Sequence, residues 1–223
     1  SSCLQQNFFV GGFDHLGRPA TPITDQPMQN YPVKPLFVTT FLFFLAFSSY
    51  SAVEKREYDI TAAGIRIGEM TATRENIDNQ TWYTLHSEVS FWFFIRVKVV
   101  YSVKSLYQNN QLIKSTVVTH TNKGDFTSAI TWNKDHYIVL VDGYKYKNTE
   151  SIRQPIHYNS ARIYFEYPRS ISSLLADNVG LIVPAENTQQ DVYTVTVQGH
   201  KNRFYFKTDG ITRAVMHHPL KNF

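Results

Sequence analysis

From Glu54 onward, apolar and polar side chains alternate along most of the chain, and turn residues interrupt the alternation at short intervals. A period of two places successive side chains on opposite faces of an extended backbone, which is the pattern of a β-strand. Residues 56–75 show this pattern twice, on either side of residues 62–64. We therefore predict that the chain folds mainly into strands joined by tight turns.

Turn sequences follow one another at intervals of about 8 to 14 residues, the spacing of one strand plus its connection. They include residues 108–111, 122–125, 133–135 and 142–145, and the pair Asp209-Gly210 is a strong hairpin signal. Consecutive strands that are joined by short turns usually pair with each other. We predict an all-β fold, in which an antiparallel meander forms a strongly curved sheet or a barrel-like structure.

One segment departs from the alternation. Residues 170–177 follow Pro168 and contain the run Ser-Ser-Leu-Leu-Ala, so we predict one short helix there. The sequence lacks the longer helical patterns that would connect parallel strands, which excludes a nucleotide-binding α/β sheet.

The composition supports this fold class and excludes other kinds of protein. The chain has 16 Phe, 14 Tyr and 3 Trp residues, and aromatic side chains favour strands. The formal net charge of +4 is spread thinly, without the basic cluster of a nucleic-acid-binding protein, so we expect no nucleic acid partner. Cys3 is the only cysteine, which excludes a disulfide framework and a Cys-x-x-Cys metal site.

The most apolar stretch of the chain is residues 36–47. A helix that crosses a bilayer needs about 20 apolar residues, whereas the apolar region of a secretory signal peptide needs about 7 to 15. Lys34 precedes the stretch, small residues follow it, and Met28 lies at a suitable distance to be the initiator. We therefore predict a signal peptide at residues 28–51.

This interpretation divides the chain into three parts. We expect residues 1–27 to be a disordered upstream extension, residues 28–51 to be the signal peptide, and residues 52–223 to form a single β domain. The signal would direct export of that domain to the periplasm, the cell exterior or the outer envelope, with cleavage near Ser51/Ala52. An uncleaved anchor and an internal core helix are the alternatives, and we expect contact with a membrane only through an uncleaved signal.

The order of the segments resembles that of an uncharacterised family of exported bacterial envelope proteins. The resemblance begins in residues 58–74, where a strand that starts with Tyr meets a Gly-Ile-x-Ile-Gly sequence. It continues through residues 87–101, 156–168 and 202–215, and it covers roughly residues 55–218. It implies an all-β, secreted or periplasmic protein, and the family has no assigned catalytic residues to carry over.

Four consecutive aromatic residues interrupt the alternation in the middle of a predicted strand. Such a run places bulk on both faces of a strand, or marks a bulge or bend. One interpretation is the wall of a pocket for an apolar ligand, and the other is a corner of the core. The candidate ligand-binding residues are Phe91, Trp92, Phe93, Phe94 and Trp132.

The sequence carries no motif that predicts catalysis or metal binding. It has neither the Gly-x-Ser-x-Gly nor the Ser-x-x-Lys pattern of serine enzymes, and its histidines lack the spacing of metal ligands. Glu166, Asp177 and Glu186 would form a catalytic carboxylate pair only if folding brought them together. We predict no catalytic residue, no metal site and no cofactor.

These observations favour a non-enzymatic, exported envelope protein that binds an apolar or amphipathic ligand, such as a lipid-like molecule, or a partner protein of the envelope. The alternative is a glycan-directed hydrolase or lyase with its site on a concave face of the sheet. A third possibility is an interaction module in which an exposed edge strand recruits a partner by strand addition.

Overall fold

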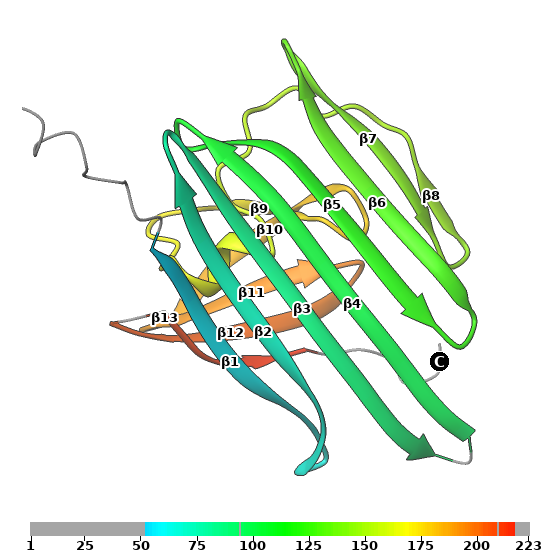
Figure 1. The fold of residues 1–223 in the computed structure, drawn as a ribbon. Coiled ribbons are helices and arrows are strands. Elements are labelled where there is room, and N and C mark those ends of the chain that lie inside the picture. The colour runs from blue at the N-terminus through cyan, green and yellow to red at the C-terminus, as the bar shows by residue number, and fades with distance from the viewer. Residues whose placement is uncertain (1–51, 94, 209, 217–223) are drawn as a thin grey trace, which may run out of the picture. The chain divides into compact units, whose positions relative to one another are not determined.

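The computed structural model describes the backbone of residues 52–93, 95–208 and 210–216, with side chains for all of these except residues 93 and 95 (Figure 1). The predicted upstream extension and signal peptide lie outside the described residues. Among the residues described, no helix has the length and apolar character that a membrane span requires.

The first sheet is an eight-stranded antiparallel meander in which each strand pairs with the next along the chain (Figure 1). Its strands are β1 (Val53–Ala62), β2 (Ile65–Ile77), β3 (Gln80–Phe93), β4 (Ile95–Gln108), β5 (Gln111–Thr121), β6 (Gly124–Asn133), β7 (His136–Gly143) and β8 (Tyr146–Asn148).

Tight turns set the register of this meander. Asn109 and Asn110 connect β4 to β5 with φ angles of 50° and 64°, a left-handed conformation that asparagine tolerates well. The predicted turns at residues 122–125, 133–135 and 142–145 also join successive strands. The sequence prediction of an antiparallel meander is therefore confirmed over this half of the domain.

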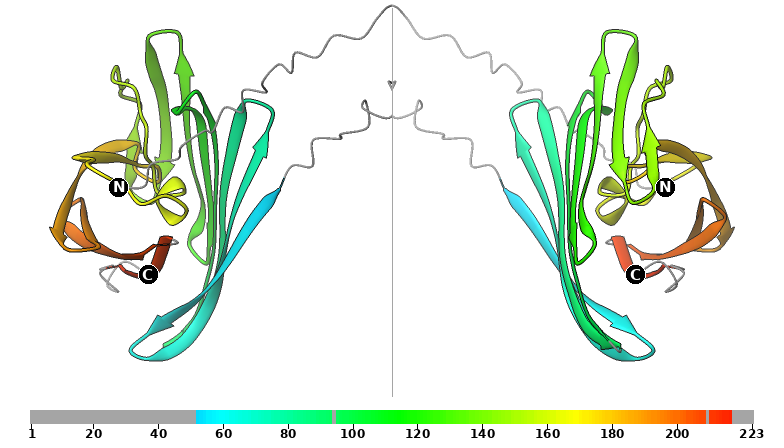
Figure 2. Two further views of the ribbon diagram at one scale, coloured as in Figure 1. Left: turned by 90° about the vertical axis from the view of Figure 1, so that its left-hand side faces the viewer. Right: turned by 90° about the vertical axis from the view of Figure 1, so that its right-hand side faces the viewer.

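The second sheet has five antiparallel strands in the order β13-β12-β11-β10-β9. They are β9 (Ser173–Ala176), β10 (Leu181–Gln189), β11 (Val192–Val197), β12 (His200–Lys207) and β13 (Gly210–Val215). Figure 2 shows this sheet against one face of the larger sheet.

Two details of the predicted fold are wrong. The larger sheet is open, with β1 and β8 as its two edges, so it does not form a barrel. Residues 170–177 do not form a helix, because residues 173–176 are strand β9, which pairs with β10. The side chains of Leu174, Leu175 and Ala176 are all buried, and the packing around this short segment overrides its local helical preference. Within the residues that the structure describes, the helical turn is the 3-10 helix η2 (Arg162–Tyr164).

The core lies between the two sheets and consists mostly of aromatic and β-branched side chains. On β7, for example, Tyr137, Val139 and Val141 are buried, whereas Ile138 and Leu140 face outward. Buried residues of the larger sheet, of η2 and of the second sheet form one continuous apolar cluster. The alternation along the sequence thus marks which face of the larger sheet is covered.

A buried aspartate connects the layers. Asp177 follows β9, and its Oδ1 atom accepts hydrogen bonds from Ser115 Oγ on β5 (2.5 Å) and from Asn159 Nδ2 (2.9 Å). Its Oδ2 atom accepts bonds from the backbone N–H of Ser160 (3.0 Å) and from the Ser160 hydroxyl. Ser128 on β6 donates to the Asp177 carbonyl oxygen (2.6 Å). One residue thereby ties β5 and β6 to the segment that precedes η2.

We expect Asp177→Ala to lower the free energy of unfolding by about 3 kcal/mol or more, because four donors, two of them buried and two part-buried, lose their acceptor. Glu186→Ala, at an exposed position on β10, should change it by less than about 0.5 kcal/mol. Urea unfolding followed by circular dichroism measures both values, and equal effects of the two substitutions would contradict this role.

A second prediction concerns Gly180, which has a φ of +65°. A Cβ atom at this position would lie 2.5 Å from Val139 Cγ1. Gly180→Ala should therefore add overpacking to backbone strain and destabilise the fold by about 2 to 4 kcal/mol. Gly199→Ala is the matched control, since Gly199 has a φ of +82° and a Cβ atom there would have no other atom within 4 Å, so only strain of about 1 kcal/mol applies. Similar losses in urea unfolding would show that the contact with Val139 is unimportant.

Candidate functional site

The β3–β4 hairpin continues past the point at which its pairing with the strands on either side ends. β2 pairs with β3 only as far as Val89, and β5 pairs with β4 only as far as Val99. Residues 90–98, which we call the aromatic tip, therefore continue as two strands alone, for about 13 Å at the usual rise per residue.

Along one edge of the aromatic tip, the side chain of Asn122 bonds to the backbone of β4 where strand β5 has ended. The backbone N–H of Lys98 donates to Asn122 Oδ1 (2.9 Å), and Asn122 Nδ2 donates to the carbonyl oxygen of Arg96 (2.8 Å). Asn122 follows the end of β5, so its amide takes over the pairing where that strand stops. These bonds support the tip and satisfy backbone groups that an isolated hairpin would expose.

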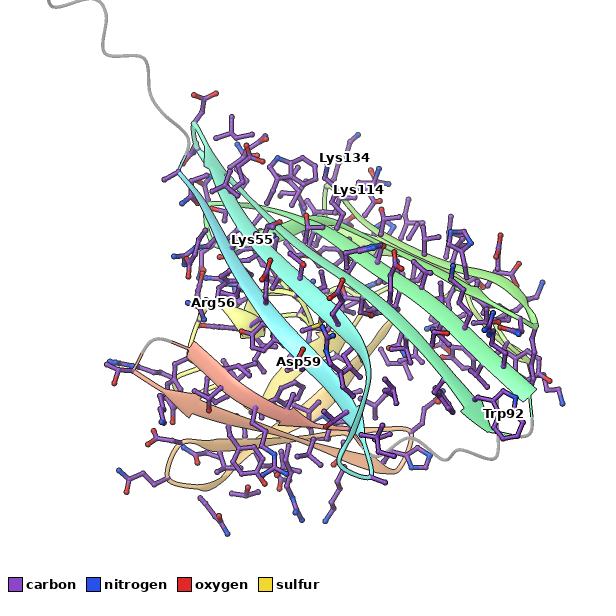
Figure 3. All side chains as sticks on the ribbon, turned by 60° about the horizontal axis from the view of Figure 1, so that its bottom comes forward. Lys55, Arg56, Asp59, Trp92, Lys114 and Lys134 are labelled. Carbon is purple, nitrogen blue, oxygen red and sulfur yellow. The ribbon has the colours of Figure 1, made fainter. Side chains whose placement is uncertain are left out.

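The two faces of the aromatic tip differ in character. Trp92 pairs with Arg96, and Ser90 pairs with Lys98, so these four side chains share one face. Trp92 is 75% exposed, and both basic residues are exposed. Figure 3 shows Trp92 near the end of the hairpin, far from Lys114 and Lys134. The outer face thus joins an exposed indole to two cations.

The opposite face of the tip is apolar and better covered. Phe91 pairs with Val97, and of these two residues Phe91 is half-buried and Val97 is buried. Residues 90–98 contain no acidic residue, so the tip carries a formal charge of +2. Of the predicted ligand-binding residues, the side chains of Phe93 and Phe94 lie outside the described part of the structure.

The structure does not bring Trp132 to the aromatic tip. Thr131, next to Trp132, lies in the same row across the sheet as Trp82 of β3. Trp82 and Phe91 are nine positions apart on one strand, which corresponds to about 30 Å. Trp132 instead packs against Tyr137 at the margin of the core, with a ring-centroid distance of 4.7 Å.

The three acidic residues considered from the sequence have separate surroundings. Glu166 pairs with Arg162, Asp177 is buried among serine and asparagine donors, and Glu186 is exposed on β10. Within the part of the chain that the structure describes, no group of three or more His, Cys, Asp or Glu side chains could hold a metal ion.

A polar cleft of about 350 Å³ lies at the end of the sheet opposite the aromatic tip, and the sequence patterns do not predict it. It is lined by Asn76, residues 78–81, Tyr83, Tyr107, Asn109, Asn110, Arg162 and Glu166. The asparagine-rich turns and the i,i+4 spacing of Arg162 and Glu166 are visible in the sequence. Only the folded chain shows that these segments meet.

The floor of the polar cleft is a fixed ion pair. Arg162 Nε and Nη2 donate to Glu166 Oε2 at 2.9 and 2.6 Å, and Tyr83 donates its hydroxyl to Glu166 Oε1. Arg162 also lies over the ring of Tyr107, 4.9 Å from its centroid. Burial and the neighbouring Glu166 carboxylate raise the pKa of Tyr83 above its usual range, so the phenol stays a donor.

The fold and these sites define an all-β protein with two antiparallel sheets, of which the larger is open and contains a hairpin whose end pairs with no neighbouring strand. The model of the family described as Domain of unknown function (DUF6134) matches residues 58–223, and the chain belongs to this family. A search of the curated proteins and a search of the solved structures each found no match. The predicted membership of an uncharacterised family is confirmed, whereas export and bacterial origin stay predictions.

The different surroundings of Trp92 and Trp132 predict different effects of their substitution on stability. Trp92→Ala should change the free energy of unfolding by less than about 0.5 kcal/mol, because the side chain is mostly exposed. Trp132→Ala should lower it by about 2 kcal/mol or more, because its ring packs on Tyr137. Urea unfolding of both variants provides the measurement, and a large loss with Trp92→Ala would mean that this side chain supports the fold.

Proposed function

We propose that this protein is an exported, non-enzymatic envelope protein that binds an anionic lipid bilayer surface through its aromatic tip. The observation that carries the proposal is the position of Trp92, three-quarters exposed in the part of the hairpin that pairs with no neighbouring strand. An exposed tryptophan next to basic side chains is the combination found where proteins meet the membrane interface.

The dimensions of the tip suit the interfacial region of a bilayer. Trp92 is the next-to-last residue of β3, so insertion of about 7 Å would bring its indole into the headgroup region. Tryptophan favours this region because its ring is apolar and its N–H can bond to polar groups. Arg96 lies at the same level and Lys98 about 7 Å further back, where both can meet lipid phosphates.

The charge of the tip favours an anionic surface. A basic side chain close to such a surface contributes about 1 kcal/mol, so Arg96 and Lys98 together contribute about 2 kcal/mol. A tryptophan and two cations support reversible association rather than permanent anchoring, which usually needs more than one signal. This proposal departs from the expectation from the sequence that the protein contacts a membrane only through an uncleaved signal.

An enclosed site for an apolar ligand is less well supported. The space between the two sheets is occupied by the continuous apolar cluster, which includes fully buried side chains such as Tyr137 and Leu175. The aromatic tip, in contrast, offers its side chains outward. We therefore place the amphipathic ligand outside the domain, as a lipid surface.

The second candidate function is a glycan-directed hydrolase or lyase, because Asp78 and Glu166 both line the polar cleft. It is the weaker candidate. The Glu166 carboxyl already accepts bonds from Arg162 and Tyr83, and the raised pKa of Tyr83 disfavours that phenol as a general base.

The fluorescence of Trp92 tests lipid binding directly. In the full chain with Trp82→Phe and Trp132→Phe, Trp92 is the only tryptophan. Vesicles of phosphatidylcholine with phosphatidylglycerol should shift its emission to shorter wavelength, and added salt should reverse the shift. Arg96→Ala with Lys98→Ala should weaken partitioning by about tenfold or more, in line with the loss of two cations.

Residues 36–47 are present in all of these proteins, so differences between them report on the tip alone. Lys114→Ala with Lys134→Ala removes the same charge at the opposite end of the sheet and serves as the matched control. The proposal fails if Trp92 emission does not respond to the anionic vesicles, or if the control pair weakens partitioning as much as the tip pair.

A further inference from the structure

The polar cleft is assembled from three segments that are far apart in the sequence. The β2–β3 turn and the β4–β5 turn form its rim. Arg162, the first residue of η2, and Glu166, two residues after η2, form its floor. Asn79 Nδ2 on one turn donates to Asn109 Oδ1 on the other at 3.1 Å, so the two parts of the rim are bonded together.

The floor is rigid because all three guanidinium nitrogens of Arg162 donate hydrogen bonds. Nη1 donates to the His157 carbonyl oxygen (2.8 Å), and the remaining bonds go to Glu166. The guanidinium lies over the ring of Tyr158, 4.8 Å from its centroid, as well as over the ring of Tyr107. The Arg162 side chain is 10% exposed. A ligand would therefore find a formed site and would lose little affinity to ordering it.

The charges of the cleft select against anions. Arg162 is neutralised by Glu166, and Asp78 on the rim adds a negative charge. A phosphate or a carboxylate would meet a net negative charge in this cleft. Arg162 is the basic residue of the lining, and its charge is already paired with Glu166. The ligand that fits this balance is neutral.

The rim offers both hydrogen-bond donors and hydrogen-bond acceptors. A primary amide has two donor hydrogens and an acceptor oxygen, and Asn79 uses one of its hydrogens for Asn109. Gln80 and Asn110 contribute further amides, and Glu166 retains acceptor positions beyond its bonds to Tyr83 and Arg162. Closely spaced donors and acceptors around a small hollow match a molecule that carries several hydroxyl groups.

We propose that the polar cleft binds a neutral sugar, either free or as the end of a longer glycan. The volume lies at the low end of the range for small-molecule sites, about 300 to 1,000 Å³. Binding needs no chemistry at Glu166 and does not depend on the aromatic tip, so this site stands apart from the proposed lipid surface.

The test uses the full chain without lipid, so its result is separate from that of the vesicle experiment. Saturation-transfer NMR and titration calorimetry are applied with glucose, galactose, N-acetylglucosamine and the disaccharides cellobiose, lactose and chitobiose. Glucuronate is the anionic comparison. We expect at least one neutral sugar to bind, and glucuronate to bind more weakly than glucose.

Asn79→Ala with Asn109→Gly removes the bonded amides of the rim, and glycine keeps the φ of 50° that residue 109 requires. The loss of two neutral hydrogen bonds should raise the dissociation constant by about tenfold or more. Asn133→Ala with Lys134→Gly makes the matched change in the β6–β7 turn, where Lys134 has a φ of 62°, and should leave it unchanged. The proposal is overturned if no neutral sugar binds, if glucuronate binds more tightly than glucose, or if the rim pair has no larger effect than the control pair.

Discussion

The hydrogen bonds around Asp177 hold together the parts of the domain on which its sites depend. The carboxyl group joins β5 to Asn159 and Ser160, and Asn159 in turn accepts bonds from the hydroxyl of Tyr107 and the backbone N–H of Arg162, both at 3.0 Å. Arg162 then holds Glu166. A continuous set of bonds therefore runs from the middle of the core to the floor of the polar cleft.

Such a network stabilises a fold only when its members are satisfied, because an unpaired polar group in the interior costs more than its hydrogen bond returns. Among the described residues, no buried side-chain nitrogen or oxygen lacks a partner. The network also adds directional contacts to the packing, because a hydrogen bond holds only over a narrow range of geometry whereas hydrophobic burial is non-directional. The side-chain bonds of Asp177, Ser115 and Ser128 fix the second layer at one position on the first.

The sequence predicts those features of the structure that depend on neighbouring residues, and it does not predict those that depend on contacts between distant segments. The hairpins from β1 to β8 are predictable because alternation and turn residues such as Asn109 act over a few positions. The open edges of the larger sheet and the strand at residues 173–176 depend on contacts with a second layer that local patterns do not encode. Trp92 is a candidate from the sequence alone, because its run of aromatic neighbours stands out. The polar cleft is not predictable in this way, because nothing in the sequence around Asn79 and Arg162 indicates that these two residues meet in the folded chain.

The length of the β3–β4 hairpin has an electrostatic consequence. The same two strands lead from the aromatic tip to the turns that border the polar cleft, a distance of about 40 Å at the usual rise per residue. The Debye length at physiological ionic strength is about 8 Å, several times shorter. A negatively charged surface at the tip would therefore be screened from Asp78 and Glu166. The hairpin separates the positive charge at one end from the negative charge at the other by enough distance that neither changes the electrostatic potential at the other end.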